Sequence, residues 1–128
     1  MSRRSRGLLP ETGISDLEMR AAPRYQILQR CFVHPAKASA REAWQCIAYN
    51  ISAAGIGMAL AVQLQERTVL SIRALGLPRA CPLQARIVRT QPIEFLWFTG
   101  CEFLNRLSDA DLTVWCSGPL DWLENHPS

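Results

Sequence analysis

One short stretch of this sequence decides the fold, AYNISAAGIG at residues 48–57. An apolar segment that should form a strand runs into it, and a second apolar strand leaves it. Between the two strands lies the pattern Asn50-x-Ser52-x-x-Gly55. Residues two apart on an extended backbone share a face, so we expect Asn50 and Ser52 to point the same way.

Gly55 should shape the corner between these strands. Glycine can adopt backbone conformations closed to other residues, and its missing side chain lets a ligand come close. A carboxamide and a hydroxyl beside it suit the hydrogen-bonding edge of a flat ligand. The same residue types also occur in ordinary turns, where Asn50 and Ser52 would bond only their own backbone. The pattern therefore needs support from a second element of the chain.

On either side of this stretch, the chain shows short apolar segments separated by turn signals, which predict an antiparallel β-barrel or sandwich. A break at Gln91–Pro92 should separate the last two strands. No alternation of strands with helices supports a parallel sheet. The six expected strands span residues 25–33, 42–50, 57–64, 68–75, 83–90 and 94–104. The aromatic side chains expected inside are Phe32, Phe95, Trp97 and Phe103.

A helix should follow the last strand. Ser108 can cap it, with Asp109 and Asp111 in the first turn near the positive end of the helix dipole. Trp115 and Trp122 should then cover the barrel core, and Gly118–Pro119 should end the helix. We therefore expect three parts: a flexible basic tail at residues 1–19, the barrel with its helix at 20–117, and a C-terminal tail with a possible helical turn at 118–128.

The composition favours a cytoplasmic protein that binds anions. The net charge is +3, and 13 of the 14 basic residues are arginine. Arginine is suited to paired contacts with phosphate and guanine edges, although an arginine excess can also reflect genome composition. Five scattered cysteines form no CxxC pair and two histidines give no zinc-type spacing, so we expect buried, reduced thiols and no metal. No secretory signal is visible, and the longest run without a polar side chain, residues 53–62, is too short to span a membrane.

No catalytic constellation is apparent in the sequence. GxSxG, HExxH and P-loop motifs are absent, and Gly55-Ile56-Gly57 lacks the third glycine of a dinucleotide fingerprint because Leu60 stands there. Asp109 and Asp111 are explained by helix capping rather than by metal binding. We therefore expect a binding protein and not an enzyme.

The second element lies upstream, where Arg20-x-x-x-Arg24 precedes the first strand and Pro23 keeps the segment out of a helix. Together with the Asn-x-Ser-x-x-Gly pattern, on six strands followed by a helix, it resembles the PilZ domain family over about residues 20–117. The resemblance implies a six-stranded antiparallel, split β-barrel. It also implies the bacterial second messenger cyclic di-GMP as the ligand, with no further cofactor.

The resemblance assigns roles to five residues. Arg20 and Arg24 would wrap the ligand against the barrel, because guanidinium groups bond phosphate oxygens in pairs and match the O6/N7 edge of guanine. Asn50 would bond the edge of the guanine ring with Ser52 beside it, and Gly55 would keep the corner tight and open. Whether one ligand or a stacked pair binds stays open.

Three functions remain to be separated. The first is a single-domain cyclic di-GMP receptor or adaptor, in which the ligand orders the N-terminal arginine segment and the protein signals through a protein partner. The alternative is a PilZ-like protein-interaction module that binds no nucleotide. The third is a barrel that binds nucleic acid, which we disfavour because the aromatic side chains are expected inside the barrel.

Overall fold

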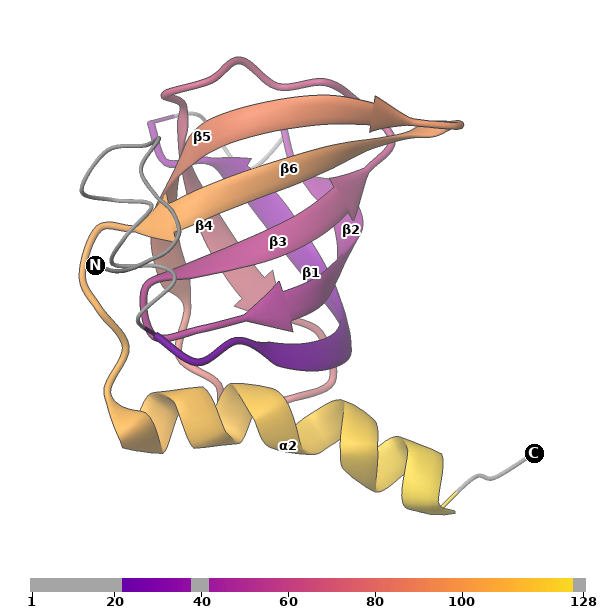
Figure 1. Ribbon diagram of the computed structural model, residues 1–128, viewed down its shortest axis with the longest axis vertical. Helices are drawn as coiled ribbons and strands as arrows, with labels where there is room; N and C mark the ends of the chain where they lie inside the picture. The colour runs from indigo at the N-terminus through magenta and orange to yellow at the C-terminus, as the bar shows by residue number, and fades with distance from the viewer. Residues whose placement is uncertain (1–21, 38–41, 126–128) are drawn as a thin grey trace, which may run out of the picture.

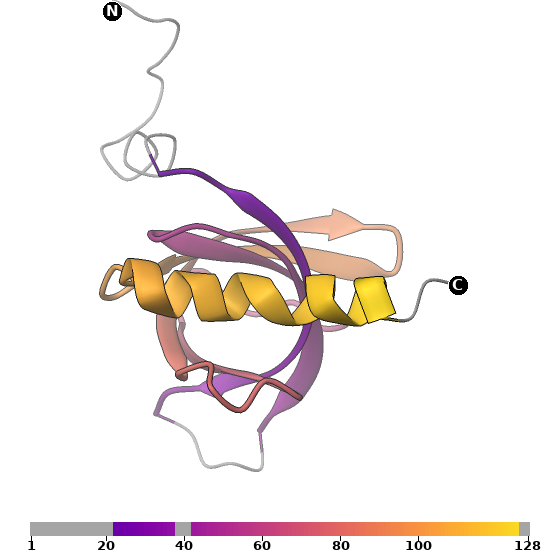
Figure 2. The ribbon, with the colours of Figure 1, turned by 90° about the horizontal axis from the view of Figure 1, so that it is seen from below.

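The computed structural model describes residues 22–37 and 42–125, so Arg20 and the predicted N-terminal tail lie outside the described residues. Within these residues, six antiparallel strands close into a barrel in the order β1-β2-β3-β6-β5-β4, and one helix lies across one end (Figures 1 and 2). The predicted barrel with a C-terminal helix is confirmed. The elements are β1 (Tyr25–Pro35), β2 (Trp44–Ile51), β3 (Gly55–Leu60), β4 (Val69–Ala74), β5 (Leu83–Ile93), β6 (Leu96–Phe103) and α2 (Asp109–Asn125).

The barrel interior is filled by every second side chain of the strands, because strand residues alternate between the two faces. In β4, Leu70 and Ile72 are fully buried, whereas Arg73 is exposed on the outer face, as the sequence predicts. The strands follow the predicted segments to within a few residues, except that β3 ends at Leu60 rather than at residue 64.

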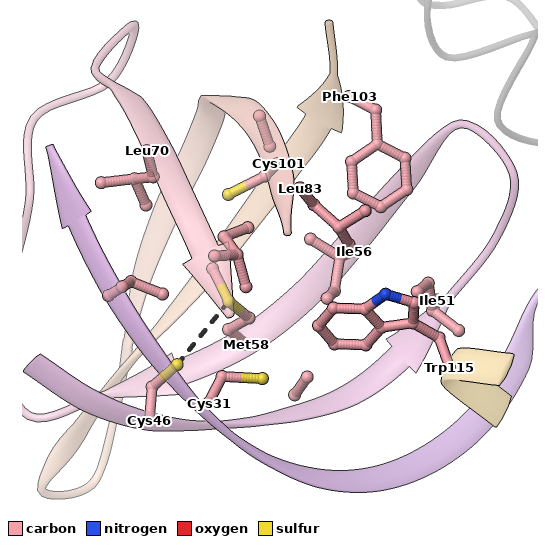
Figure 3. Packing of buried hydrophobic residues seen from close by; sticks show 14 of the residues in the cluster. Cys31, Cys46, Ile51, Ile56, Met58, Leu70, Leu83, Cys101, Phe103 and Trp115 are labelled. Carbon is pink, nitrogen blue, oxygen red and sulfur yellow. Dashed lines mark hydrogen bonds between the residues drawn. The ribbon is translucent and has the colours of Figure 1, made fainter. Parts of the chain in front are cut away.

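Three cysteines belong to this core. Cys31, Cys46 and Cys101 are buried, and the Cys46 thiol donates to the sulfur of Met58 at 3.7 Å (Figure 3). Burial raises the pKa of Cys101 to about 12, so its thiol stays protonated at neutral pH. These three thiols therefore act as small apolar side chains, as predicted. The prediction of burial does not hold for Cys81 and Cys116, which are only partly buried.

Trp115 attaches the helix to the barrel. Its side chain is fully buried, and its indole N–H donates to the carbonyl oxygen of Cys81 at 3.2 Å. Figure 3 shows the indole ring beside Ile51 and Ile56, at the end of the barrel that α2 covers. The prediction that Trp115 covers the core is confirmed, whereas the side chain of Trp122 lies outside the described part of the structure.

The helix begins as predicted but does not end as predicted. The Ser108 hydroxyl accepts the N–H of Asp111 at 3.1 Å, which caps the first turn. The prediction that Gly118–Pro119 ends the helix is wrong, because α2 continues to Asn125. Gly118 lies within α2, so it does not adopt the left-handed conformation that ends helices. No helix in the described part of the chain is long and apolar enough to cross a membrane.

The predicted break at Gln91–Pro92 is also wrong. β5 continues to Ile93, and the chain turns at Glu94, which has a φ of 52°. Strand pairing explains why Pro92 is tolerated: it faces Trp97 of β6, while β4 pairs with β5 only as far as Arg86. The donor that proline lacks is not needed on an edge without a neighbour. The resulting hairpin extends beyond the barrel (Figure 1).

Two of the four aromatic side chains expected inside lie outside. Phe95 is 92% exposed at the tip of the β5–β6 hairpin, and Phe32 is exposed on the outer face of β1. Phe103 is buried as predicted, and Trp97 is half-buried. The sequence argument against nucleic-acid binding therefore fails for Phe32 and Phe95.

Candidate functional site

The pairing of β1 with β2 brings the two sequence motifs to one place. Tyr25 faces Ile51 and Gln26 faces Asn50 in this antiparallel pair. Arg24 directly precedes β1 and Ser52 directly follows β2, so both lie at the same end of the pair. Arg24 is exposed there. The backbone of Arg24 therefore lies next to the corner formed by Asn50, Ser52 and Gly55.

Ser52 closes the turn between β2 and β3. It is 1% exposed, and its hydroxyl oxygen accepts the N–H groups of Ala54 and Gly55, each at 3.1 Å. Its own N–H donates to the carbonyl oxygen of Gly55 at 2.9 Å. These are the bonds of a self-bonded serine turn. Ser52 therefore contributes to the site by fixing the corner.

Gly55 has the backbone conformation of an ordinary strand residue. Among the described glycines only Gly76 has a positive φ, so Gly55 does not adopt a conformation closed to other residues. It opens β3, pairs with Glu102 of β6 and completes the turn bonds of Ser52. Gly55 therefore lies in a tight corner without using the conformational freedom that glycine has.

A β-bulge turns Asn50 to the outer face of the barrel. Ala48 is fully buried, so regular alternation would point Asn50 inward too. The register between β2 and β3 shifts between Ala48 and Asn50, which makes Tyr49 the extra residue. The Asn50 side chain therefore lies over its cross-strand partner Gly57. A Cβ at Gly57 would stand 2.8 Å from the Asn50 amide oxygen.

A second bulge does the same for Arg89 on β5. Ile87 is fully buried, and the register with β6 shifts between Ile87 and Arg89, so Val88 is the extra residue. Arg89 thereby reaches the outer face opposite Gly100. Bulges commonly re-aim side chains next to binding sites.

The two bulges align four residues across four neighbouring strands. Asn50 of β2 faces Gly57 of β3, Gly57 faces Gly100 of β6, and Gly100 faces Arg89 of β5. We call Asn50, Gly57, Gly100 and Arg89 the glycine row. Gly57 and Gly100 have no side chains, and both are buried, because the Asn50 carboxamide lies over Gly57 and the Phe98 ring lies over Gly100. The outer face of the row therefore presents a carboxamide, an aromatic ring and a guanidinium group.

Aromatic side chains border the Arg89 end of the glycine row. The guanidinium carbon of Arg89 lies 5.2 Å from the centroid of the Phe98 ring. The Tyr49 ring lies 5.7 Å from Phe98, tilted by 50°. Burial raises the pKa of Tyr49, while the charge of Arg89 opposes this rise, so the phenol stays protonated at neutral pH. A Cβ at Gly100 would meet the Phe98 ring at 3.3 Å.

Sequence reasoning missed most of the glycine row. Gly57 and Gly100 carried a usable signal, because glycine inside an apolar strand marks a bulge or a close approach. Arg89 carried none, because its outward position depends on the bulge at Val88. No group of three or more histidine, cysteine or acidic side chains in the described part of the chain is arranged to hold a metal. The arrangement can bind by hydrogen bonds, charge and stacking.

Comparisons with known proteins agree with this fold. The sequence model of the PilZ domain family matches residues 18–115. The structure of the Bacillus subtilis inhibitor of motility (MotI/DgrA) is 18% identical, with a TM-score of 0.55 over 84% of this chain and 52% of that one. The PilZ domain with c-di-GMP of YcgR from Escherichia coli is 16% identical, with a TM-score of 0.59 over 84% of this chain and 96% of that one. This chain thus spans about half of the Bacillus protein. No curated protein matches.

Proposed function

Because this chain belongs to the PilZ domain family, we propose that it is a receptor domain for cyclic di-GMP. One observation carries the proposal: β1 and β2 pair so that Arg24 starts beside the corner that holds Asn50 and Ser52. A structure of the same fold, the PilZ domain of Escherichia coli YcgR, is described with c-di-GMP. The proposal needs no catalytic group on the protein.

In the proposed complex, charge and hydrogen bonding act on different parts of the ligand. The guanidinium groups of Arg24 and of Arg20, which lies outside the described residues, bond phosphate oxygens or the O6/N7 edge of guanine. The Asn50 amide, for which Gly57 leaves room, bonds a guanine edge. Ser52 and Gly55 hold the corner through their mutual turn bonds.

We further propose that ligand binding is passed to a protein partner in the bacterial cytoplasm. Ordering of the Arg20–Arg24 segment on the ligand would change the surface beside the corner. Apolar side chains exposed on the outer face of the barrel and at the hairpin tip supply contacts for a partner, among them Leu28, Ile47 and Phe95. These side chains equally favour the alternative function, a PilZ-like interaction module that binds no nucleotide.

Titration calorimetry with cyclic di-GMP tests the proposal. We expect wild-type protein to bind with micromolar or tighter affinity, and Arg24→Ala to bind at least about tenfold more weakly, since each charged hydrogen bond contributes about 1.5–3 kcal/mol. Arg73→Ala is the matched control, because Arg73 is an exposed arginine on β4, which lies opposite β3 in the barrel order. Folded wild-type protein that releases no heat would contradict the proposal and favour the interaction module.

A further inference from the structure

The Arg89 end of the glycine row is built like a contact for a flat ring. The Phe98 ring packs over Gly100, and the Arg89 guanidinium group lies against that ring. A guanidinium group that rests on an aromatic ring has one face covered and its orientation restricted. Because Arg89 is exposed, its other face is available to a ligand.

The folding of the barrel does not require this arrangement. Arg89 and Phe98 lie on the outer face, and a cation–π pair at an exposed site contributes only about 0.5–1 kcal/mol to stability. The bulge at Val88 nevertheless aims Arg89 along the same row as Asn50, which a second bulge turns outward. Two independent bulges that converge on two glycines indicate a binding surface rather than a packing detail.

The size of the row fits a ligand with two purines. Neighbouring strands lie about 4.8 Å apart, so the three strand spacings from Asn50 to Arg89 span about 14 Å. A guanine held by Asn50 would leave the Phe98 ring, which covers Gly100, and Arg89 ahead of it along the row. A second purine placed there would meet the exposed face of the Arg89 guanidinium group.

We propose that Arg89, held by Phe98 and flanked by Tyr49, stacks on a guanine that Asn50 does not hold. This contact rests on the proposed function and extends it, because it makes Arg89 a specificity residue for a ligand with two purines. The stacked guanine belongs either to the same cyclic di-GMP molecule or to a second one. The chemistry is the same in both cases, and the stoichiometry of binding distinguishes them.

Calorimetry on Arg89→Ala and Arg89→Lys tests this contact. Stacking on arginine or an aromatic ring is worth about 1–3 kcal/mol per base, so Arg89→Ala should weaken binding of cyclic di-GMP by about tenfold or more. Arg89→Lys should lose nearly as much, because lysine keeps the charge but lacks the planar group. Phe98→Leu should show a smaller loss, because the guanidinium group then loses its support.

The stoichiometry identifies the source of the stacked guanine. One ligand per chain for wild type, with weaker binding in the Arg89 variants, assigns the contact to the same molecule. Two ligands per chain, reduced to one in the Arg89 variants, assign it to a second molecule. Wild-type affinity and stoichiometry in both Arg89 variants would overturn the contact, while a loss in Arg24→Ala would leave the proposed function standing. Full binding by Arg89→Lys alone would also overturn it, in favour of a simple charge contact.

Discussion

The two faces of β3 and β6 follow different rules. On the inner face, Ile56, Met58 and Cys101 are almost completely buried and fill the barrel. On the outer face of the same strands, Gly57 pairs with Gly100, and polar side chains from β2 and β5 flank the two glycines. The inner face stabilises the fold by burying apolar surface. On the outer face, the Asn50 carboxamide and the Phe98 ring occupy the space that side chains at positions 57 and 100 would fill. Substitutions inside should therefore change stability, and substitutions in the glycine row should change binding.

Trp115→Ala should cause the largest effect, on stability. The side chain is fully buried and bonded to the Cys81 carbonyl. Its removal should lower the free energy of unfolding by about 3–5 kcal/mol, measured by urea denaturation followed by circular dichroism. Trp115→Phe, which keeps a ring but loses the indole N–H, should lose less. A change below about 1 kcal/mol for Trp115→Ala would contradict the role of Trp115 in docking α2.

Ser52→Ala should rank second and tests the corner that joins the two faces. The N–H groups of Ala54 and Gly55 would lose their acceptor, which should cost about 1–3 kcal/mol of stability. Hydrogen exchange at these two amides should become faster, and NMR measures it residue by residue. Ser52→Thr keeps the hydroxyl group and serves as the control. Unchanged exchange at both amides in Ser52→Ala would show that the hydroxyl does not hold the turn.

Gly57→Ala should show most clearly that the outer face affects binding and the inner face affects stability. The new Cβ would stand 2.8 Å from the Asn50 amide oxygen, so the carboxamide must move away. We expect binding of cyclic di-GMP to weaken by about tenfold, while stability changes by less than about 1 kcal/mol. Calorimetry and urea denaturation measure the two quantities.

The matched variants for this test are Asn50→Ala and the double variant with Gly57→Ala. If Gly57 acts through Asn50, the two losses should not add, because the second substitution removes nothing that the first has left. Full additivity of the two losses, or wild-type affinity in Gly57→Ala, would show that Gly57 does not affect binding through the Asn50 carboxamide.

Asn50→Asp should have the smallest effect, and it should strengthen binding. A carboxylate is a stronger acceptor than a carboxamide for the N1 and N2 donors of guanine, so affinity at pH 7.5 should rise by about threefold to tenfold. Binding would lower the pKa of the carboxyl group. The gain is therefore present above its ordinary pKa of about 3.9 and is lost as the pH falls through the lowered value. Calorimetry at pH 7.5 and at lower pH measures this, and weaker binding at pH 7.5 would contradict the proposed guanine contact.

The residues of the inner face could be predicted from the sequence, because apolar side chains alternate regularly along the strands. Alternation in β4 places Leu70 and Ile72 inside, and Ser108 marks the start of α2. The motif residues Arg24, Asn50 and Ser52 were identified through the resemblance to the PilZ domain family, and the structure brings them to one corner. The strand alternation and the helix cap depend on residues close together in the chain, so local rules describe them.

The glycine row could not be predicted from the sequence, because it depends on the register between strands. Tyr49 and Val88 are ordinary strand residues, and nothing in their identity marks them as the extra residues of bulges. Pro92 was misread as a break because its tolerance depends on which edge of β5 lacks a neighbour. Phe95 was placed inside because the hairpin tip could not be located before the turn at Glu94 was known.

Backbone amide NMR during titration with cyclic di-GMP tests the central claim most directly. The account predicts that the largest shift changes fall at Arg24, at the corner from Asn50 to Gly55, and along the glycine row at Gly57 and Gly100. Signals from the buried Leu70 and Ile72 of β4 should stay in place. An absence of shifts at saturating ligand, or shifts confined to α2 and the β5–β6 hairpin tip, would contradict a nucleotide site on this face of the barrel.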